Sequence, residues 1–308
     1  MLEKIILASP RGFCAGVEVA IDTVKRLAEA YPEETIYVKH AIVHNDHVIE
    51  EIKSEYKNVK FIEELSEIPN DGARVIFSAH GTPTKVYDEA KKRKLKVTDA
   101  TCMLVEKVHE KARRYANRGY EIILIGHKGH QEVIGTMGQV EMHLLENVEG
   151  IKTLGINPLR KVAYITQTTL STYDTKEIEE SLIKEFPNLV SSNDDICYAT
   201  TNRQEAVMAL LGKSDLFFVV GGKESSNSKR LVETAEQGGI KAYLISNYTE
   251  INPFWLEGIK NVGVTSGAST PENLVRKVAA HLQENYGGIV EEYVHKIEHI
   301  NFPEKELV

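Results

Sequence analysis

Cysteine is scarce in this chain, whose 308 residues include only Cys14, Cys102 and Cys197. An odd number of cysteines cannot pair fully within one chain, and so few argue against the disulfide framework of small secreted domains. Free cysteine is also among the most buried residue types, so three unrelated core thiols are one interpretation. The alternative is that the thiols bind a metal or act as nucleophiles.

Long apolar runs and an excess of basic residues are also missing. No segment approaches the roughly 18 apolar residues of a membrane span, and the N-terminus lacks the basic and apolar regions of a signal peptide. The formal net charge of -8 argues against nucleic acid as the main partner, because phosphate backbones select basic surfaces. We therefore expect a cytoplasmic globular protein without a membrane or nucleic-acid partner, although a few local donors could hold a small anion.

The first cysteine lies in the segment Ser9-Pro-Arg-Gly-Phe-Cys-Ala-Gly-Val17. The apolar run 5–8 before it predicts a buried strand, and apolar residues at helical spacing over 17–31 predict an amphipathic helix. Cys14 then stands just before a helix N-terminus. The unpaired amide groups and the positive dipole end found there favour a thiolate, the form that binds metal or attacks an electrophile.

The other two cysteines repeat this placement. Cys102 follows a predicted strand that ends at Thr98, and it precedes a helix that we expect from about Val105 to Ala116. Cys197 precedes a helix for which Thr201 and Gln204 fit a capping box. The three cysteines are spaced by about one third of the chain. Repeated context at regular spacing favours a shared role over three inert thiols.

Strands and helices alternate along the whole chain, which predicts an α/β fold. We divide it into three similar βα domains, over residues 1–100 with Cys14, 101–194 with Cys102, and 195–308 with Cys197 and a C-terminal tail. The local sequences around the cysteines differ, so this is a weak repeat of architecture. If the three domains pack around a common axis, the cysteines converge.

Turns rich in Gly, Ser, Thr and His follow several predicted strands. In an open α/β sheet, ligands bind in the crevice beyond the carboxyl ends of the strands. A single histidine at such a place is more often a surface or capping residue, but several donors together indicate a site. The candidates from the pattern are His44, His80, the two histidines and the glutamate of the segment 126–138, and the turns 166–171, 221–229 and 266–271 with their hydroxyl groups and other short donors.

Three convergent thiolates would form a metal site that lacks one protein ligand. Structural zinc sites usually have four ligands, often in paired C-x-x-C spacing, which this sequence does not contain. An iron-sulfur cubane with three cysteine ligands leaves one iron open to substrate. A zinc hydrolase that uses the cysteines and a water, and a non-catalytic sensor that bears a cluster, are the alternatives from other functional classes.

Seven motifs, in the same order over about residues 4–275, resemble those of the 4-hydroxy-3-methylbut-2-enyl diphosphate reductase (IspH/LytB) family. This family carries out the last step of the non-mevalonate pathway to isoprenoid precursors. The motifs are Pro10-Arg-Gly-Phe-Cys-Ala-Gly16, Ser78-Ala-His-Gly81, Asp99-Ala-Thr-Cys102, Gly135-Thr-Met-Gly-Gln139, Thr166-Gln-Thr-Thr-Leu-Ser171, Asp195-Ile-Cys-Tyr-Ala-Thr-Thr-Asn-Arg-Gln204 and Ser225-Ser-Asn-Ser228. So many long motifs are far more specific than a single short one.

The resemblance implies three α/β domains around one central 4Fe-4S cluster with three cysteine ligands, Cys14, Cys102 and Cys197, and one open iron. It implies two-electron reductive loss of the substrate hydroxyl, which yields isopentenyl and dimethylallyl diphosphates, with an electron donor such as ferredoxin or flavodoxin. Family positions that bind the diphosphate match His44, His80, His130, Ser225, Ser226, Asn227 and Ser269.

The resemblance also places Thr168 and Glu132 near the substrate hydroxyl, with Glu132 as the proton donor. Met103 and Gln131 depart from the family pattern, since proline is common at both positions. These departures change the stiffness of two turns and affect no expected ligand.

Overall fold

The computed structural model describes residues 1–190 and 194–308. Its strands form three sheets, and every strand pairing among the described residues is parallel. This confirms the predicted α/β class with three sheets. Near-continuous apolar strands such as Leu216–Val220 suit this arrangement, because helices cover both faces of a parallel sheet.

Two of the sheets have the same strand order. One contains β2 (Ile36–Lys39), β3 (Val59–Ile62), β4 (Arg74–Phe77) and β5 (Lys96–Asp99), in the order β3-β2-β4-β5. The other contains β6 (Glu121–Ile125), β7 (His143–Leu145), β8 (Val162–Thr166) and β9 (Leu189–Val190), in the order β7-β6-β8-β9. In each, the fourth strand along the chain lies at an edge, and a cysteine follows it.

The third sheet is completed by the N-terminus of the chain. Its strands β10 (Leu216–Val220), β11 (Lys241–Ile245), β12 (Asn261–Ser266), β1 (Lys4–Ser9) and β13 (Ile289–Val294) follow the order β11-β10-β12-β1-β13. Strand β1 takes the place that β5 and β9 take in the other sheets. The repeated unit is therefore a set of four sheet strands, the last of which is followed by a cysteine and a helix. In the third copy, three strands come from the C-terminal part of the chain and the fourth, β1, comes from the N-terminus.

This pairing differs from the sequence-based grouping of residues 1–100, which put β1 with β2 to β5. Parallel pairing between distant segments leaves no mark in local periodicity, so the sequence pattern could not reveal it. By contacts, the chain divides into two compact units: residues 1–17, 44–48 and 198–301 form unit 1, and residues 18–43, 49–197 and 302–308 form unit 2. The domain limits at 100 and 194 stay predictions, and residues 191–193 of the expected second domain lie outside the described residues.

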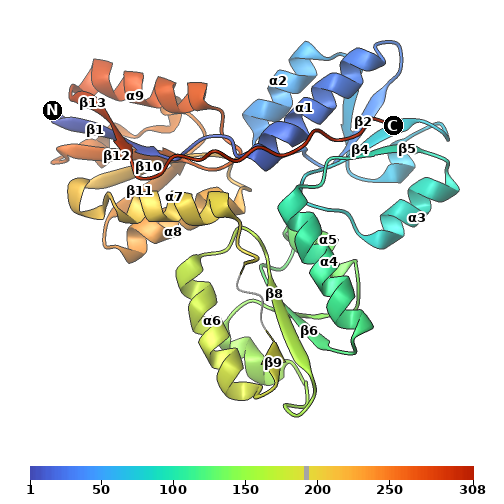
Figure 1. Ribbon diagram of the computed structural model, residues 1–308. Coiled ribbons are helices and arrows are strands. Elements are labelled where there is room, and N and C mark those ends of the chain that lie inside the picture. The colour runs from blue at the N-terminus through green and yellow to red at the C-terminus, as the bar shows by residue number, and fades with distance from the viewer. Residues whose placement is uncertain (191–193) are drawn as a thin grey trace. The chain divides into compact units, whose positions relative to one another are not determined.

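The helices lie on the faces of the sheets (Figure 1). Helix α4 packs on the β6–β8 sheet through Val108, Ala112 and Tyr115, and α7 packs on the β10–β12 sheet through Ala206 and Val207. The helices are α1 (Ala15–Ala30), α2 (Asp46–Glu55), α3 (Thr84–Lys92), α4 (Met103–Asn117), α5 (Gln131–Met137), α6 (Thr172–Glu185), α7 (Tyr198–Met208), α8 (Ser226–Gln237) and α9 (Glu272–Tyr286), with short 3-10 helices at Leu65–Glu67, Val148–Thr153, Leu211–Lys213, Tyr248–Glu250 and Pro253–Leu256.

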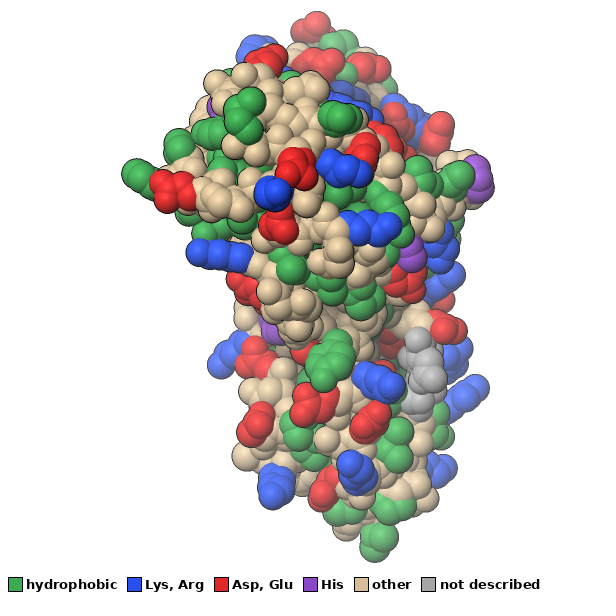
Figure 2. Space-filling model, turned by 90° about the vertical axis from the view of Figure 1, so that its left-hand side faces the viewer, with side chains coloured by type: hydrophobic (Ala, Val, Ile, Leu, Met, Phe, Trp, Pro, Cys, Tyr) green, Lys and Arg blue, Asp and Glu red, His purple; other side chains and the backbone are tan. Residues whose placement is uncertain are grey.

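The surface is of mixed charge. Figure 2 shows basic and acidic side chains interspersed on one face, which agrees with a moderate formal net charge of -8. Among the helices of the described residues, none has both the length and the apolar character that crossing a bilayer requires.

Candidate functional site

Each cysteine occupies the same position in its repeated unit. Cys102 is the N-cap of α4, while Cys14 and Cys197 directly precede the first residues of α1 and α7. All three side chains are partly buried. The sequence-based placement of the cysteines at helix N-termini is thus confirmed.

The main chain holds the three cysteines in one recurrent way. The N–H of Cys14 donates to the carbonyl of Ala268 at 3.1 Å, that of Cys102 to Ala79 at 3.0 Å, and that of Cys197 to Thr168 at 2.9 Å. Each acceptor lies two residues beyond the end of the third strand of a sheet, namely β12, β4 and β8. The thiols therefore stand beyond the carboxyl ends of the strands, where α/β proteins bind their ligands.

The chemistry of this donor set fits an iron-sulfur group. Soft thiolate ligands select such clusters, and a helix N-terminus favours the thiolate. Burial raises the pKa of the Cys14 thiol, and the nearby Arg203 guanidinium opposes that rise. A partly buried thiolate at this place would be stabilised by a bound cation, which is what iron would supply.

A second recurrent position follows the first strand of each sheet. His44, His130 and Ser225 each stand five residues beyond the end of β2, β6 and β10, respectively. His130 caps α5, its Nδ1 accepting from the Glu132 N–H at 3.2 Å, and Ser225 caps α8, its Oγ accepting from the Ser228 N–H at 3.3 Å. Three of the predicted binding residues thus occupy equivalent turns, each at or beside a helix N-terminus, a place that favours anions.

In unit 2, the turn after β4 lies against α5. The His80 and His130 rings meet edge to face, with centroids 6.2 Å apart. A Cβ at Gly135 would lie 2.6 Å from the Gly81 carbonyl oxygen, and Gly81 itself has a φ of +87°. Glycine at both positions lets the two turns approach closely, which brings His80 and His130 together.

Glu132 and Thr168 also meet in unit 2. The Glu132 carboxylate accepts from the Thr168 N–H at 2.6 Å and from the Thr168 hydroxyl at 3.1 Å. The glutamate side chain is only 3% exposed. Burial raises the pKa of Glu132 to about 7, the charge of Asp195 adds to the rise, and the bonds from Thr168 oppose it. A carboxyl group with a pKa near neutrality can give up a proton at physiological pH.

We expect Glu132 to make stability depend on pH. Its pKa rises from 4.5 to about 7 on folding, so the folded state binds the Glu132 proton more tightly than the unfolded state does. The contribution of this proton to the free energy of unfolding is fully present below pH 4.5 and is lost as pH rises through 7. The loss amounts to about 3 kcal/mol at pH 8. Glu132→Gln cannot ionise, so the melting temperature of the variant relative to wild type should rise between pH 5 and pH 8. A constant difference across this range would contradict the raised pKa.

Unit 1 brings together a second set of predicted residues. The Asn227 side chain donates to the Thr200 hydroxyl at 3.1 Å and accepts from the Ala268 N–H at 2.9 Å. The Ser269 hydroxyl donates to the His44 carbonyl at 3.2 Å. Asn227 and Ser269 are both buried, as are Ser225 and Ser226. The start of α8, which carries Asn227, and the turns that carry His44 and Ser269 are therefore linked by hydrogen bonds.

Some residues of these networks were not predicted from the sequence. Thr200 lies within the Cys197 motif and bonds Asn227, yet a threonine in a helix gives no signal of its own. His109 is buried on α4, and burial lowers its pKa to about 4. Its helical spacing indicated only a core position.

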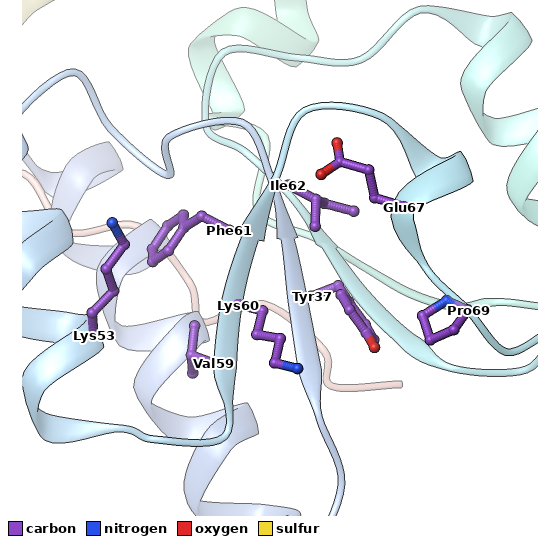
Figure 3. Close-up of a pocket in the computed structure, with 8 residues that line it drawn as sticks. All are labelled: Tyr37, Lys53, Val59, Lys60, Phe61, Ile62, Glu67 and Pro69. Atoms are coloured by element: carbon purple, nitrogen blue, oxygen red, sulfur yellow. The ribbon is translucent and has the colours of Figure 1, made fainter.

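Two surface hollows lie apart from the predicted site residues. One, of about 520 Å³, borders β3, and Figure 3 shows Lys53 beside the Phe61 ring on its wall. The other, of about 560 Å³, lies along the outer side of α5, where Ile134 and Met137 are exposed. None of the predicted cysteine, histidine, serine, threonine, asparagine or glutamate residues lines either hollow.

Comparison with known proteins agrees with these features. A model of the LytB protein family matches residues 5–283. The 4-hydroxy-3-methylbut-2-enyl diphosphate reductase of Enterobacter sp. (strain 638) is 50% identical over 291 residues, 92% of this chain and 91% of the relative. The protein of that name from Azoarcus sp. (strain BH72) is 48% identical over 308 residues, 99% of this chain and 97% of the relative.

Solved structures give the same result. The E-1-hydroxy-2-methyl-but-2-enyl-4-diphosphate reductase from Plasmodium falciparum has a TM-score of 0.93 and 38% identity, and the match covers 100% of this chain and 96% of that one. A structure of (E)-4-hydroxy-3-methyl-but-2-enyl diphosphate reductase has a TM-score of 0.64 and 31% identity, with 92% of this chain and 100% of that chain covered. The chain therefore belongs to the LytB family of 4-hydroxy-3-methylbut-2-enyl diphosphate reductases.

Proposed function

We propose that this chain converts (E)-4-hydroxy-3-methylbut-2-enyl diphosphate to isopentenyl and dimethylallyl diphosphates by two-electron reductive dehydroxylation. Family membership establishes an oxidoreductase of isoprenoid biosynthesis. The observation that carries the reaction is the buried Glu132, whose pKa is raised to about 7 and whose carboxylate is bonded by Thr168. Loss of a hydroxyl as water needs a proton donor of this kind, because hydroxide is a poor leaving group.

Cys14, Cys102 and Cys197 would hold one 4Fe-4S cluster with one open iron. When bound, this group would pass the two electrons one at a time from the external donor to the substrate, and its open iron would act as a Lewis acid. The protein positions the thiols at three equivalent helix N-termini, as their main-chain bonds indicate. An electron donor such as ferredoxin or flavodoxin, and a cytoplasmic location, are parts of the same proposal.

The diphosphate would be held by neutral donors. They all lie beyond strand ends, either in a turn or, for Ser226 and Asn227, in the first turn of α8: His44, His80, His130, Ser225, Ser226, Asn227 and Ser269. Such places bind anions without a large positive surface, because amide groups and the helix dipole supply the attraction. This explains how a chain of net charge -8 could bind a diphosphate.

Asn227→Ala should weaken the binding of inorganic diphosphate about tenfold, the cost of a lost hydrogen bond to a charged group. The substitution also removes the acceptor for the Ala268 N–H, so the neighbouring Ser269 turn loses support. Titration calorimetry on anaerobic protein measures the affinity. Asn147→Ala, in an exposed cap of unit 2, is the control and should bind as wild type. Unchanged affinity in the Asn227 variant would place the anion elsewhere.

The direct test of the reaction is an anaerobic assay with a chemical reductant and the allylic diphosphate. We expect both isoprenoid diphosphates as products, and no turnover without the reductant. Turnover that needs no electrons would indicate a hydrolase instead.

A further inference from the structure

Arg203 is a fully buried arginine on α7, and it binds the turn that precedes Cys14. Its Nη2 donates to the Gly12 carbonyl at 2.8 Å and to the Phe13 carbonyl at 3.5 Å. Its Nη1 donates to the Ala199 carbonyl at 3.0 Å, and its side chain is 0% exposed. A buried guanidinium needs a compensating charge, since an unpaired charge in a protein interior is costly.

The compensating charge comes from the C-terminal tail, which we define as the segment after β13, residues 295–308. Glu298 Oε1 lies 3.3 Å from Arg203 Nη1 and also accepts from the Asn202 side chain at 2.8 Å. The Glu298 side chain is 16% exposed. Two residues before Glu298, the Lys296 Nζ donates to the side-chain oxygen Oδ1 of Asn202 at 2.9 Å. The family model matches residues 5–283, so this carboxylate lies outside the matched segment.

The turn itself is held on both sides of Cys14. Gly12 has a φ of +75° and its N–H donates to the Ser266 hydroxyl at 2.8 Å. The Ala15 N–H donates to the Tyr198 hydroxyl oxygen at 3.1 Å. Tyr198 and Arg203 both belong to α7, so one helix contacts the turn before and after the cysteine.

We infer that Glu298 fixes Arg203, and that Arg203 in turn sets the conformation of the Gly12–Phe13 turn from which Cys14 projects. Both are positioning residues that act through the main chain next to Cys14. The inference rests on the proposed function only where Cys14 is taken as a cluster ligand. Through Arg203, the tail thereby stabilises the turn next to Cys14, which lies far from it in sequence.

Hydrogen exchange measured by mass spectrometry on full-length, anaerobically purified protein tests this inference. Glu298→Gln keeps the size of the side chain and an acceptor for Asn202, but it removes the charge that balances Arg203. We expect amides in the peptide 9–17 to exchange about tenfold faster in this variant, while the peptide 97–106 around Cys102 exchanges as in wild type. Bound iron should also be lost faster to a chelator.

Glu291→Gln is the matched control, because Glu291 lies just before the tail, in β13, and forms an exposed pair with Lys4. It should leave both peptides unchanged. Arg203→Lys should match Glu298→Gln, since a lysine cannot bond the Gly12 and Ala199 carbonyls in the same fork. If that variant fails to fold, Glu298→Gln alone decides the result.

Exchange in peptide 9–17 within about twofold of wild type, or an equal rise in both peptides, would overturn the inference. The first result would mean that the pair does not hold the turn, and the second that it only stabilises the whole protein. If wild type contains no cluster but exchange changes as expected, the positioning role stands and the proposed function fails.

Discussion

Replacing Cys14, Cys102 or Cys197 with Ser should in each case remove the bound cluster and reduce turnover to background. A serine hydroxyl ionises far less readily than a thiol and is a poor ligand for iron in such clusters. Each cysteine holds the same place in its repeated unit, so we expect the three variants to behave alike. Iron and sulfide content, measured after anaerobic purification, reports the loss independently of activity.

Thr101→Ser is the matched control for these variants. It lies next to Cys102 and keeps the hydroxyl that donates to Asp99 at 2.6 Å, so iron content and turnover should stay near wild type. Full iron occupancy with turnover in any one cysteine variant would remove that residue from the ligand set. It would also break the equivalence between the three repeated units.

Glu132→Gln should reduce turnover by about a hundredfold or more, the usual scale for a lost general acid. Glutamine preserves the size of the side chain and can still accept from Thr168, so the cluster spectrum and substrate binding should survive. In wild type, burial raises the pKa of Glu132 to about 7. We therefore expect the wild-type rate to fall as pH rises above 7, because the donor loses its proton.

Glu146→Gln provides the control, since Glu146 is an exposed carboxylate that accepts from the Lys128 N–H at 2.8 Å. It should leave the rate and its pH profile unchanged. Near wild-type turnover of Glu132→Gln across the pH range would show that Glu132 is not the donor. Thr168 with a bound water, or the substrate diphosphate, would then take that role.

Much of the local arrangement could be predicted from the sequence. Apolar runs and helical spacing placed Cys14, Cys102 and Cys197 before helices, and the structure confirms all three positions. The glycine-rich segment after β6 indicated a site because glycine permits close approach. The contact between Gly135 and the Gly81 turn shows why it is needed.

The long-range features could not be predicted in this way. Strand β1 joins the sheet of β10 to β13, although its sequence reads only as a short buried strand. The pairing of Arg203 with Glu298 joins residues that are far apart in the chain, and neither residue type marks a ligand site. Tertiary packing decides such contacts, whereas local periodicity reports only the face that a residue occupies.

We propose that three cysteines hold one cluster whose fourth iron is open to substrate. Mössbauer spectroscopy on iron-57-labelled, anaerobically purified protein, with iron, sulfide and zinc counted per chain, tests it most directly. We predict about four iron and four sulfide per chain, with one iron whose signal changes when the allylic diphosphate is added. Stoichiometric zinc without sulfide, or a cluster whose irons do not respond to the substrate, would contradict the account.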